Sequence, residues 1–135
     1  MATAFLVEIV TPERTVFSGS AERLSVPGTE GSLGILGGHA PLLTSLKIGE
    51  ATMTEAGGKV RRFYIGGGFL EVKKNKVTIL ADEAAADTEI DAAEAERQLQ
   101  AAGEKLSAAG EGPEAVAAKI AYDRAAARQK VAGKL

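Results

Sequence analysis

Apolar residues recur at every second position near the start of the chain, where Phe5, Val7 and Ile9 alternate with residues 6, 8 and 10 (Leu, Glu and Val) and share one side of an extended segment. Similar short apolar runs recur, with turn-forming residues between them, at 24–26, 63–65, 69–72 and 77–80. Short strands at this spacing are typical of antiparallel sheets that pack face to face. The pattern therefore predicts an all-β sandwich or barrel over the first part of the chain.

The residue pattern changes near residue 84. Residues 1–83 hold twelve of the sixteen glycines and seven alanines, whereas the remainder holds eighteen alanines and four glycines. Alanine favours helices, and glycine is more typical of turns between strands. We therefore place a β domain at residues 1–86 and a helical domain at residues 87–135.

The first helix is expected to begin after Asp91. An aspartate there can accept hydrogen bonds from the first N–H groups of a helix, and Glu94 completes the sequence pattern of a capping box. Ile90 can pack weakly on Ala95 as a staple. The apolar positions that follow are spaced by four and three residues, as in paired helices. They are Ala95, Leu99, Ala102, Leu106 and Ala109.

A second helix is expected after a glycine-containing break at 110–112. Pro113 suits its first turn, where a backbone N–H is not needed. Its apolar stripe is also thin and comprises Val116, Ile120, Ala127 and Val131. Two helices joined by a short loop form an antiparallel hairpin. Because alanine removes little apolar surface from water, at about 25 cal/mol per Å², docking of the hairpin is expected to be marginal.

Charge differs between the two predicted helices. Residues 84–112 carry seven acidic and two basic side chains, whereas residues 113–135 carry two acidic and five basic ones. The helices should therefore attract each other. The basic residues, among them Lys119, Arg124, Arg128 and Lys130, could equally meet an acidic surface elsewhere, or simply complement the negative end of a helix and stay hydrated.

Length and composition narrow the classes of function. With 135 residues, the chain is expected to form one domain with an appendage. It has no cysteine, which excludes disulfides, thiolate nucleophiles and thiolate metal sites. A net charge of −2 gives no reason to expect a nucleic-acid partner. No stretch approaches the roughly 20 apolar residues of a membrane helix, so a soluble protein that is not exported is expected.

The sequence contains no recognisable catalytic, cofactor or metal site. The glycine run 66–68 lies between two strand-like segments instead of before a helix, which argues against a phosphate-binding loop. Gly57-Gly58-Lys59 lacks the spacing of a P-loop. His39 is the only histidine. Because no partner for a general base or a metal site accompanies it, we interpret it as a contact residue or a surface imidazole.

Four motifs within the first 83 residues closely resemble the epsilon subunit of F-type ATP synthases. They are the glycine-rich segment 27–44, the first hairpin at 10–19 and the two last strands at 67–72 and 77–82. The resemblance implies a β-sandwich of about ten strands followed by a C-terminal antiparallel two-helix hairpin. It also implies a non-catalytic rotor subunit in the central stalk of a bacterial, proton-translocating ATP synthase.

The same resemblance implies partners and contact residues. The sandwich would join the catalytic head to the membrane c-ring through the gamma subunit, with transient contacts to alpha and beta and without a cofactor. Membrane association would occur only through the complex, at the cytoplasmic face of the bacterial inner membrane. Carried over by position, the c-ring contacts are Glu30, Gly31 and Ser32, and the gamma contacts are Thr11, His39 and Thr44.

In this family the hairpin can lie folded beside the sandwich or extend along gamma and restrain ATP hydrolysis. The basic residues Lys119, Arg124, Arg128 and Lys130 would then be candidate inhibitory contacts. Some bacterial members bind ATP through an Ile-Asp-x-x-Arg-Ala motif. The corresponding residues here are Ile90, Asp91 and Ala95, with Glu94 in place of the arginine. Because a carboxylate repels phosphate, ATP binding by this route is expected to be absent or very weak.

Two other classes of function are weighed against the rotor subunit. A free-standing nucleotide-sensing regulatory protein would need a basic pocket near the hairpin, and Glu94 argues against one. A small enzyme built on a β-sandwich would need convergent polar residues, and none can be nominated. Co-elution with gamma would separate the rotor subunit from both alternatives.

Overall fold

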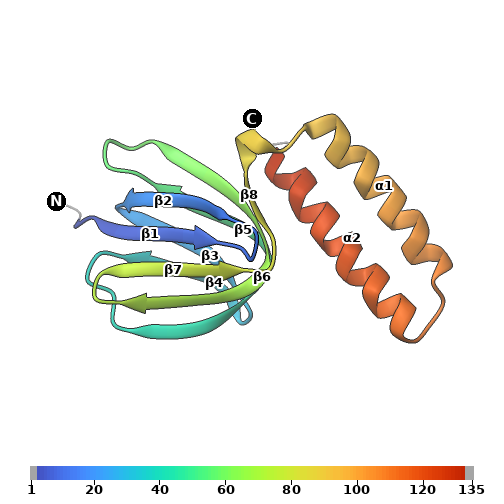
Figure 1. Cartoon of the computed structure of the whole chain (residues 1–135), viewed down its shortest axis with the longest axis horizontal. Helices are drawn as coiled ribbons and strands as arrows, with labels where there is room; N and C mark the ends of the chain where they lie inside the picture. Colours follow the sequence, from blue (N-terminus) through green and yellow to red (C-terminus); the bar gives the residue numbers. More distant parts are fainter. Residues whose placement is uncertain (1–2, 133–135) are drawn as a thin grey trace.

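A computed structural model describes residues 3–132, which form a β-sandwich followed by two helices (Figure 1). The strands are β1 Phe5–Val10, β2 Thr15–Ala21, β3 Arg23–Gly28, β4 Gly31–Leu36, β5 Leu42–Thr54, β6 Val60–Lys73, β7 Lys76–Ala81 and β8 Ala84–Ala86. A short 3₁₀ turn, η1 Asp87–Glu89, leads to the helices α1 Ala92–Ala108 and α2 Pro113–Ala132.

The strands follow the order β2-β1-β7-β6-β5-β3-β4, and β8 pairs with β6. All neighbours are antiparallel except β1 and β7, which run parallel. The first part of β6 pairs with β8 and its second part with β7. Because β5 pairs with β6 along most of its length, these two long strands belong to both layers of the sandwich.

The described residues contain eight strands, fewer than the about ten that the family resemblance implies. Two apolar runs that look separate in the sequence lie in one strand. Residues 63–65 and 69–72 both belong to β6, and the glycines between them form a bend. Gly68 has a φ of +141°, and a Cβ there would lie 2.2 Å from the carbonyl oxygen of Leu80. The glycine run is therefore a bend where β6 closely approaches β7.

The core lies between the two layers of the sandwich. Phe5, Val7 and Ile9 are buried, as the alternation in the sequence predicts, whereas Leu6 between them is 54% exposed. The other members of the core come from β2 to β8. This cluster of buried residues includes no residue beyond Ala86 among those that the structure describes.

The first helix begins where its cap predicts. The Asp91 carboxylate accepts a hydrogen bond from the Glu94 N–H at 3.0 Å, and α1 starts at the next residue. The Glu94 carboxylate is turned toward Arg97 and Gln98 further along α1. Of the stripe predicted on α1, Ala95 is buried and the four other members are half-buried.

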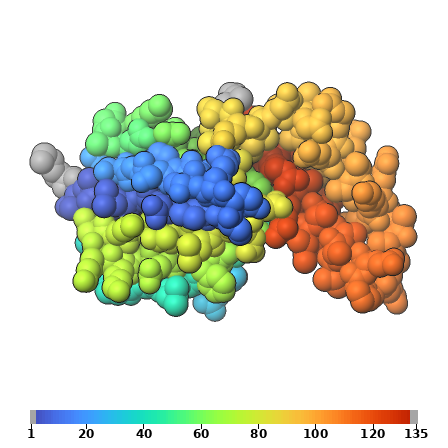
Figure 2. All heavy atoms as spheres, in the orientation of Figure 1, coloured from blue at the N-terminus to red at the C-terminus, as the bar shows by residue number. Residues whose placement is uncertain are grey.

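The stripe predicted on the second helix is partly wrong. Val116 and Ile120 are 61% and 42% exposed, and the buried residues of α2 are Ala125, Val131 and Ala132. The end of α2 near Ala132 packs against the sandwich, whereas the turn end of the hairpin stands away from it (Figures 1 and 2). Val116 and Ile120 therefore lie where no layer of the sandwich covers them.

Candidate functional site: partner-facing surfaces and the hairpin seam

The predicted c-ring contact is an exposed turn between β3 and β4. Glu30, Gly31 and Ser32 are all exposed, and Gly31 has a φ of +125°, which favours glycine. The turn is tied to β5, because the hydroxyl oxygens of Thr29 and Ser45 lie 3.2 Å apart. The structure thus presents the Glu30 carboxylate on a turn that is anchored to the sheet.

Thr11 ends β1 and is only 9% exposed. Its hydroxyl accepts hydrogen bonds from the N–H groups of Glu13 and Arg14, both at 3.3 Å, and donates to the Arg14 carbonyl at the same distance. These bonds close the turn between β1 and β2. Because its hydroxyl is used within the turn, Thr11 would affect a partner mainly by setting the shape of this turn.

His39 lies in the loop between β4 and β5 and is half-buried. Its Nδ1 is 2.7 Å from the carbonyl oxygen of Ala40. The loop is held by Asn75, whose side-chain oxygen accepts from the Gly38 N–H at 3.0 Å and whose amide donates to the Ala4 carbonyl at 2.9 Å. Sequence reasoning missed Asn75, although an asparagine between two strand-like runs is a recognised turn signal.

Thr44 lies in β5 and is half-buried, opposite Leu70 of β6. The structure does not gather Thr11, His39 and Thr44 into one cluster. His39 is in the loop that Asn75 ties to the start of β1, whereas Thr11 follows the end of β1. Thr44 shares the inner face of the sheet with its buried partner Leu70, whereas Ser45 shares the outer face with Phe69.

A row of apolar side chains crosses β1, β7 and β6 on the outer side of the sheet. It runs from Val10, the half-buried residue before Thr11, toward Ser45, the residue after Thr44. Val10 lies opposite Leu80, Leu80 opposite Phe69, and Phe69 opposite Ser45. Leu80 and Phe69 are 54% and 55% exposed, although they point away from the core. We call Val10, Leu80 and Phe69 the apolar row. Neighbouring large apolar side chains on a solvent-facing sheet are a signal for a binding surface.

The surface beside the apolar row is charged. The next cross-strand row brings together Glu8, Thr78 and Glu71, which are paired in register. Beyond it, Lys76 and Lys73 lie opposite each other. The sequence indicates that these residues face solvent. It does not show which of them lie side by side, because that depends on strand order and register.

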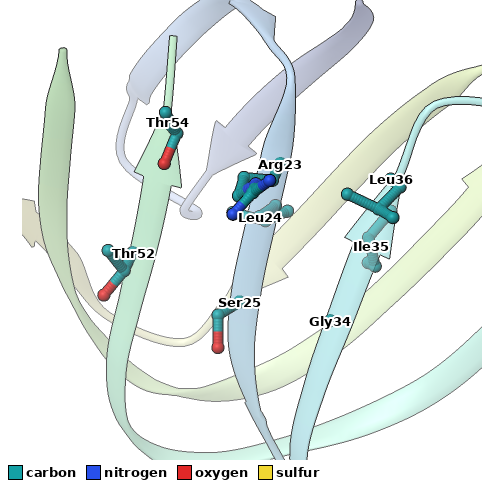
Figure 3. A pocket seen from close by; sticks show the side chains of 8 residues that line it. All are labelled: Arg23, Leu24, Ser25, Gly34, Ile35, Leu36, Thr52 and Thr54. Atoms are coloured by element: carbon teal, nitrogen blue, oxygen red, sulfur yellow. The ribbon is translucent and has the colours of Figure 1, made fainter. Parts of the chain in front are cut away.

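The opposite layer carries a different surface, a shallow hollow of about 500 Å³ on β3, β4 and β5 (Figure 3). Gly34 contributes no side chain to it, and Leu36, which is 57% exposed, forms part of its wall. Its other lining residues are Arg23, Leu24, Ser25, Ile35, Thr52 and Thr54. Leu36 is therefore an exposed apolar residue on β4, at one end of the strand order, whereas the apolar row lies on β1, β7 and β6.

Four side chains meet where the hairpin lies against the sandwich. The Glu83 carboxylate accepts a hydrogen bond from the Tyr64 hydroxyl at 2.8 Å and another from Arg128 at 3.2 Å. Arg124 lies 3.6 Å from the other Glu83 oxygen. Arg128 also donates to the Tyr64 hydroxyl at 3.3 Å and stacks over its ring. We call Tyr64, Glu83, Arg124 and Arg128 the Glu83 cluster.

The remaining basic residues of α2 are placed differently. Lys119 pairs with Asp123 of the same helix at 2.8 Å. Lys130 is exposed and lines a cleft of about 450 Å³ between α2 and β5. Of the four candidate inhibitory residues, Arg124 and Arg128 therefore contact acidic groups of the sandwich in this arrangement, and Lys119 and Lys130 do not enter that cluster.

The residues that correspond to the ATP motif line a pocket of about 380 Å³ at the start of α1. Ile90, Asp91 and Ala95 are joined there by Arg128 of α2. Glu89 and Glu94 also line the pocket, and their carboxylates are paired with Arg14 and Arg97. Three carboxylates beside one guanidinium make a poor environment for a phosphate chain.

Residues 3–132 also bear on metal binding and on membrane insertion. These residues contain no group of three or more histidine, cysteine, aspartate or glutamate side chains that could hold a metal ion. Neither helix in this part of the chain is long and apolar enough to cross a membrane.

Known proteins have similar sequences. Residues 4–87 match the family described as ATP synthase, Delta/Epsilon chain, beta-sandwich domain. The ATP synthase epsilon chain of Chromohalobacter salexigens is 48% identical over 124 residues, which cover 92% of this chain and 83% of the relative. The ATP synthase epsilon chain of Desulforamulus reducens is 39% identical over 132 residues, 98% of this chain and 99% of the relative.

Two solved structures show a similar fold. A chain of the Euglena gracilis mitochondrial ATP synthase has a TM-score of 0.76 and 23% identity, covering 88% of this chain and 75% of that chain. A chain of the Tetrahymena thermophila mitochondrial ATP synthase, from its central stalk and c-ring, has a TM-score of 0.59 and 17% identity, covering 94% and 95%. The family match and the two epsilon chains show that this chain belongs to the ATP synthase delta/epsilon family.

Proposed function

We propose that this chain is the rotor subunit that joins the catalytic head of a bacterial F-type ATP synthase to the membrane c-ring through the gamma subunit. Its relatives support the role in the complex, and the surfaces described above support the partners. The observation that carries the proposal is the apolar row, which occupies the sheet between the positions next to Thr11 and Thr44.

The apolar row suits a tight contact with gamma. Leu80 and Phe69 face solvent in the isolated chain, and burying them in a complex would remove apolar surface from water. Interfaces of stable assemblies have apolar centres and polar rims, and here Glu8 and Glu71 form such a rim on one side. We therefore assign the outer face of β1, β7, β6 and β5 to gamma.

The turn that carries Glu30, Gly31 and Ser32 would contact the c-ring. It is exposed, and its link to Ser45 sets it at the end of the apolar row. The surfaces for gamma and the c-ring would then be adjacent, as expected of a subunit that joins the two. In this arrangement the chain is held at the cytoplasmic face of the inner membrane by the complex, and it touches alpha and beta only when the hairpin extends.

Binding to an epsilon-free head of alpha, beta and gamma tests the assignment of the apolar row. The double variant F69A/L80A should bind at least about tenfold more weakly than the unchanged chain, because two central apolar side chains are lost. Its own folding should be preserved, since both residues are exposed.

L36A is the matched control, because Leu36 is 57% exposed on the other layer. It should bind like the unchanged chain. Equal weakening by L36A, or full binding by F69A/L80A, would show that gamma does not dock on the apolar row. Binding of the unchanged chain to alpha and beta with the same affinity whether or not gamma is present would count against the whole proposal.

A further inference from the structure

The strand β4 is an edge strand with one open side. The strand order ends at β4, which pairs within residues 3–132 only with β3. At the other end of the order, β2 contacts β8, and Arg14 just before β2 is paired with Glu89 of η1. In the part of the chain that the structure describes, β4 is therefore the edge that offers the more open row of backbone N–H and C=O groups.

The register with β3 indicates which backbone groups of β4 point to the open side. Pro27 lies opposite Ser32 and has no N–H, so these two residues form a pair without backbone hydrogen bonds. Such pairs alternate with hydrogen-bonded pairs along an antiparallel ladder, and their backbone groups point away from the neighbouring strand. The groups of Ser32, Gly34 and Leu36 therefore point to the open side. One of them, the Leu36 carbonyl, accepts a hydrogen bond from the His39 N–H at 3.2 Å.

The sequence of β4 lacks the features that usually keep edge strands apart. Exposed edges are commonly protected by charged side chains, prolines or bulges. Residues 31–36 read Gly-Ser-Leu-Gly-Ile-Leu and contain neither a charge nor a proline, and their register with β3 continues without a bulge. Ile35 is buried, whereas Leu36 is 57% exposed on the outer face. An uncharged, regular edge with an exposed leucine is suited to pairing with another strand.

The outer face of β4 has room for a side chain from such a partner. Gly34 lines the hollow shown in Figure 3, and a Cβ on it would have no heavy atom within 4 Å. The Ser32 hydroxyl oxygen lies 3.2 Å from the hydroxyl oxygen of Ser25, so this side chain is turned toward β3 and away from the open side. An apolar side chain that approaches from the open side can therefore lie next to Gly34.

A second copy of this chain fits the shape of this edge. If two β4 strands pair antiparallel about a two-fold axis at Gly34, each Gly34 lies opposite its equivalent, and Ser32 lies opposite Leu36 of the second copy. The backbone groups on the open side then bond to one another, because hydrogen-bonded pairs occur at every second residue. Leu36 of the second copy is diagonal to Gly34, within reach of the hollow. On the inner face, Leu33 would lie opposite Ile35 of the second copy and extend both cores.

Charge is complementary across the same axis. Arg23 lies on β3 opposite Leu36, and Glu30 belongs to the turn just before β4. Both side chains are exposed, and neither forms an ion pair within residues 3–132. Antiparallel pairing at Gly34 places Glu30 of one copy at the end of β4 where Arg23 of the other copy lies. The interface would therefore bring opposite charges together at each of its ends.

From these features we propose that β4 is a self-association edge, through which two copies of this chain pair antiparallel about a two-fold axis at Gly34. Six residues from each copy make a small interface, so the pairing is weak and belongs to the free chain at high concentration. A second copy on this edge would also lie against the turn at 30–32 and prevent its proposed contact with the c-ring. That consequence rests on the proposed function, whereas the pairing itself does not.

Sedimentation equilibrium of the isolated full chain tests the pairing. The average mass should rise from 13.9 kDa toward twice that value as the concentration increases from about 1 to 500 µM. G34K should keep the mass of one chain over this range, because two like charges would lie directly opposite each other on the axis. It should fold like the unchanged chain, since Gly34 has open space at its Cβ and no positive φ.

A mixture of G34K and G34E tests the position of the axis. Each variant alone should remain a single chain, whereas the mixture should regain the mass of two chains because opposite charges then meet at the axis. Recovery in the mixture also shows that both variants are folded. An absence of recovery would overturn the pairing at Gly34.

S18K is the matched control, because Ser18 is exposed on β2 at the other end of the strand order. It should associate like the unchanged chain. The proposal would be overturned if the unchanged chain kept the mass of one chain at about 500 µM, or if G34K associated as strongly as S18K. Because these measurements use the isolated chain, either result would leave the proposed contacts with gamma and the c-ring in place.

Discussion

At the scale of single residues, Glu94 decides the charge of the pocket at the start of α1. Its carboxylate lines the pocket together with Glu89 and Asp91, while Arg128 is turned toward Glu83. A phosphate chain would therefore meet three carboxylates, of which those of Glu89 and Glu94 are paired with Arg14 and Arg97, and one arginine, Arg128, which is paired with Glu83. This arrangement gives a structural reason to expect weak nucleotide binding, which the sequence predicts from Glu94 alone.

We expect the unchanged chain to bind ATP no more tightly than about 1 mM at physiological salt, and E94R to bind at least about tenfold more tightly, since it replaces a repulsive charge by an attractive one. Isothermal titration calorimetry measures both. E96R, on an exposed position of the same helix, controls for net charge and should resemble the unchanged chain. Binding tighter than millimolar by the unchanged chain would contradict the expectation.

At the scale of elements, β6 shows how one strand can serve two layers. Its first part pairs with β8 and its second with β7, and the change of partner occurs at the glycine bend. Gly68 there combines a positive φ with close contact to the carbonyl of Leu80. The bend therefore depends on the absence of a side chain at this position.

G68A should lower the free energy of unfolding by about 2–4 kcal/mol, because the new Cβ adds backbone strain and a steric clash in the core of the sheet. Urea unfolding measures this loss. G34A is the control, since Gly34 has open space where its Cβ would be and no positive φ. Its stability should stay within about 1 kcal/mol of the original. Equal stability of the two variants would show that the bend tolerates a side chain.

Local signals in the sequence predict where strands and helices form better than they predict how these elements pack on one another. The alternation at Phe5, Val7 and Ile9 and the cap at Asp91 depend on neighbouring residues, and both are confirmed. Val116 and Ile120 were assigned wrongly because the buried side of α2 is set by the position of the sandwich, which no local pattern encodes. The predicted contact residues for gamma and the c-ring stay predictions.

The apolar row and the Glu83 cluster could not be predicted from the sequence for the same reason. Leu80 and Phe69 become neighbours only through the register of β6 and β7. Glu83 and Arg128 are 45 residues apart and meet only when the hairpin is docked. The charge difference between the two helices indicates that the basic residues of α2 would contact acidic side chains. It does not indicate that these side chains belong to the sandwich.

At the scale of the whole molecule, the two parts of the chain differ in how they are stabilised. The cluster of buried residues in the sandwich ends at Ala86. The hairpin instead relies on small residues and a few ion pairs. A part with its own core can fold alone, whereas a part held by a few polar contacts can change position without unfolding the rest. Removing the hairpin should therefore separate binding to the catalytic head from any effect on ATP hydrolysis.

ATP hydrolysis by an epsilon-free head of alpha, beta and gamma provides that separation. A version that ends at Ala86 should bind the head but leave hydrolysis unchanged, because it keeps the apolar row and lacks α2. The full chain should slow hydrolysis partially, and E83Q should slow it further at equal occupancy, because more hairpins are free to reach the head. If neither the full chain nor E83Q slows hydrolysis while both bind, the hairpin does not act as a brake, and the chain serves the complex chiefly through its sandwich.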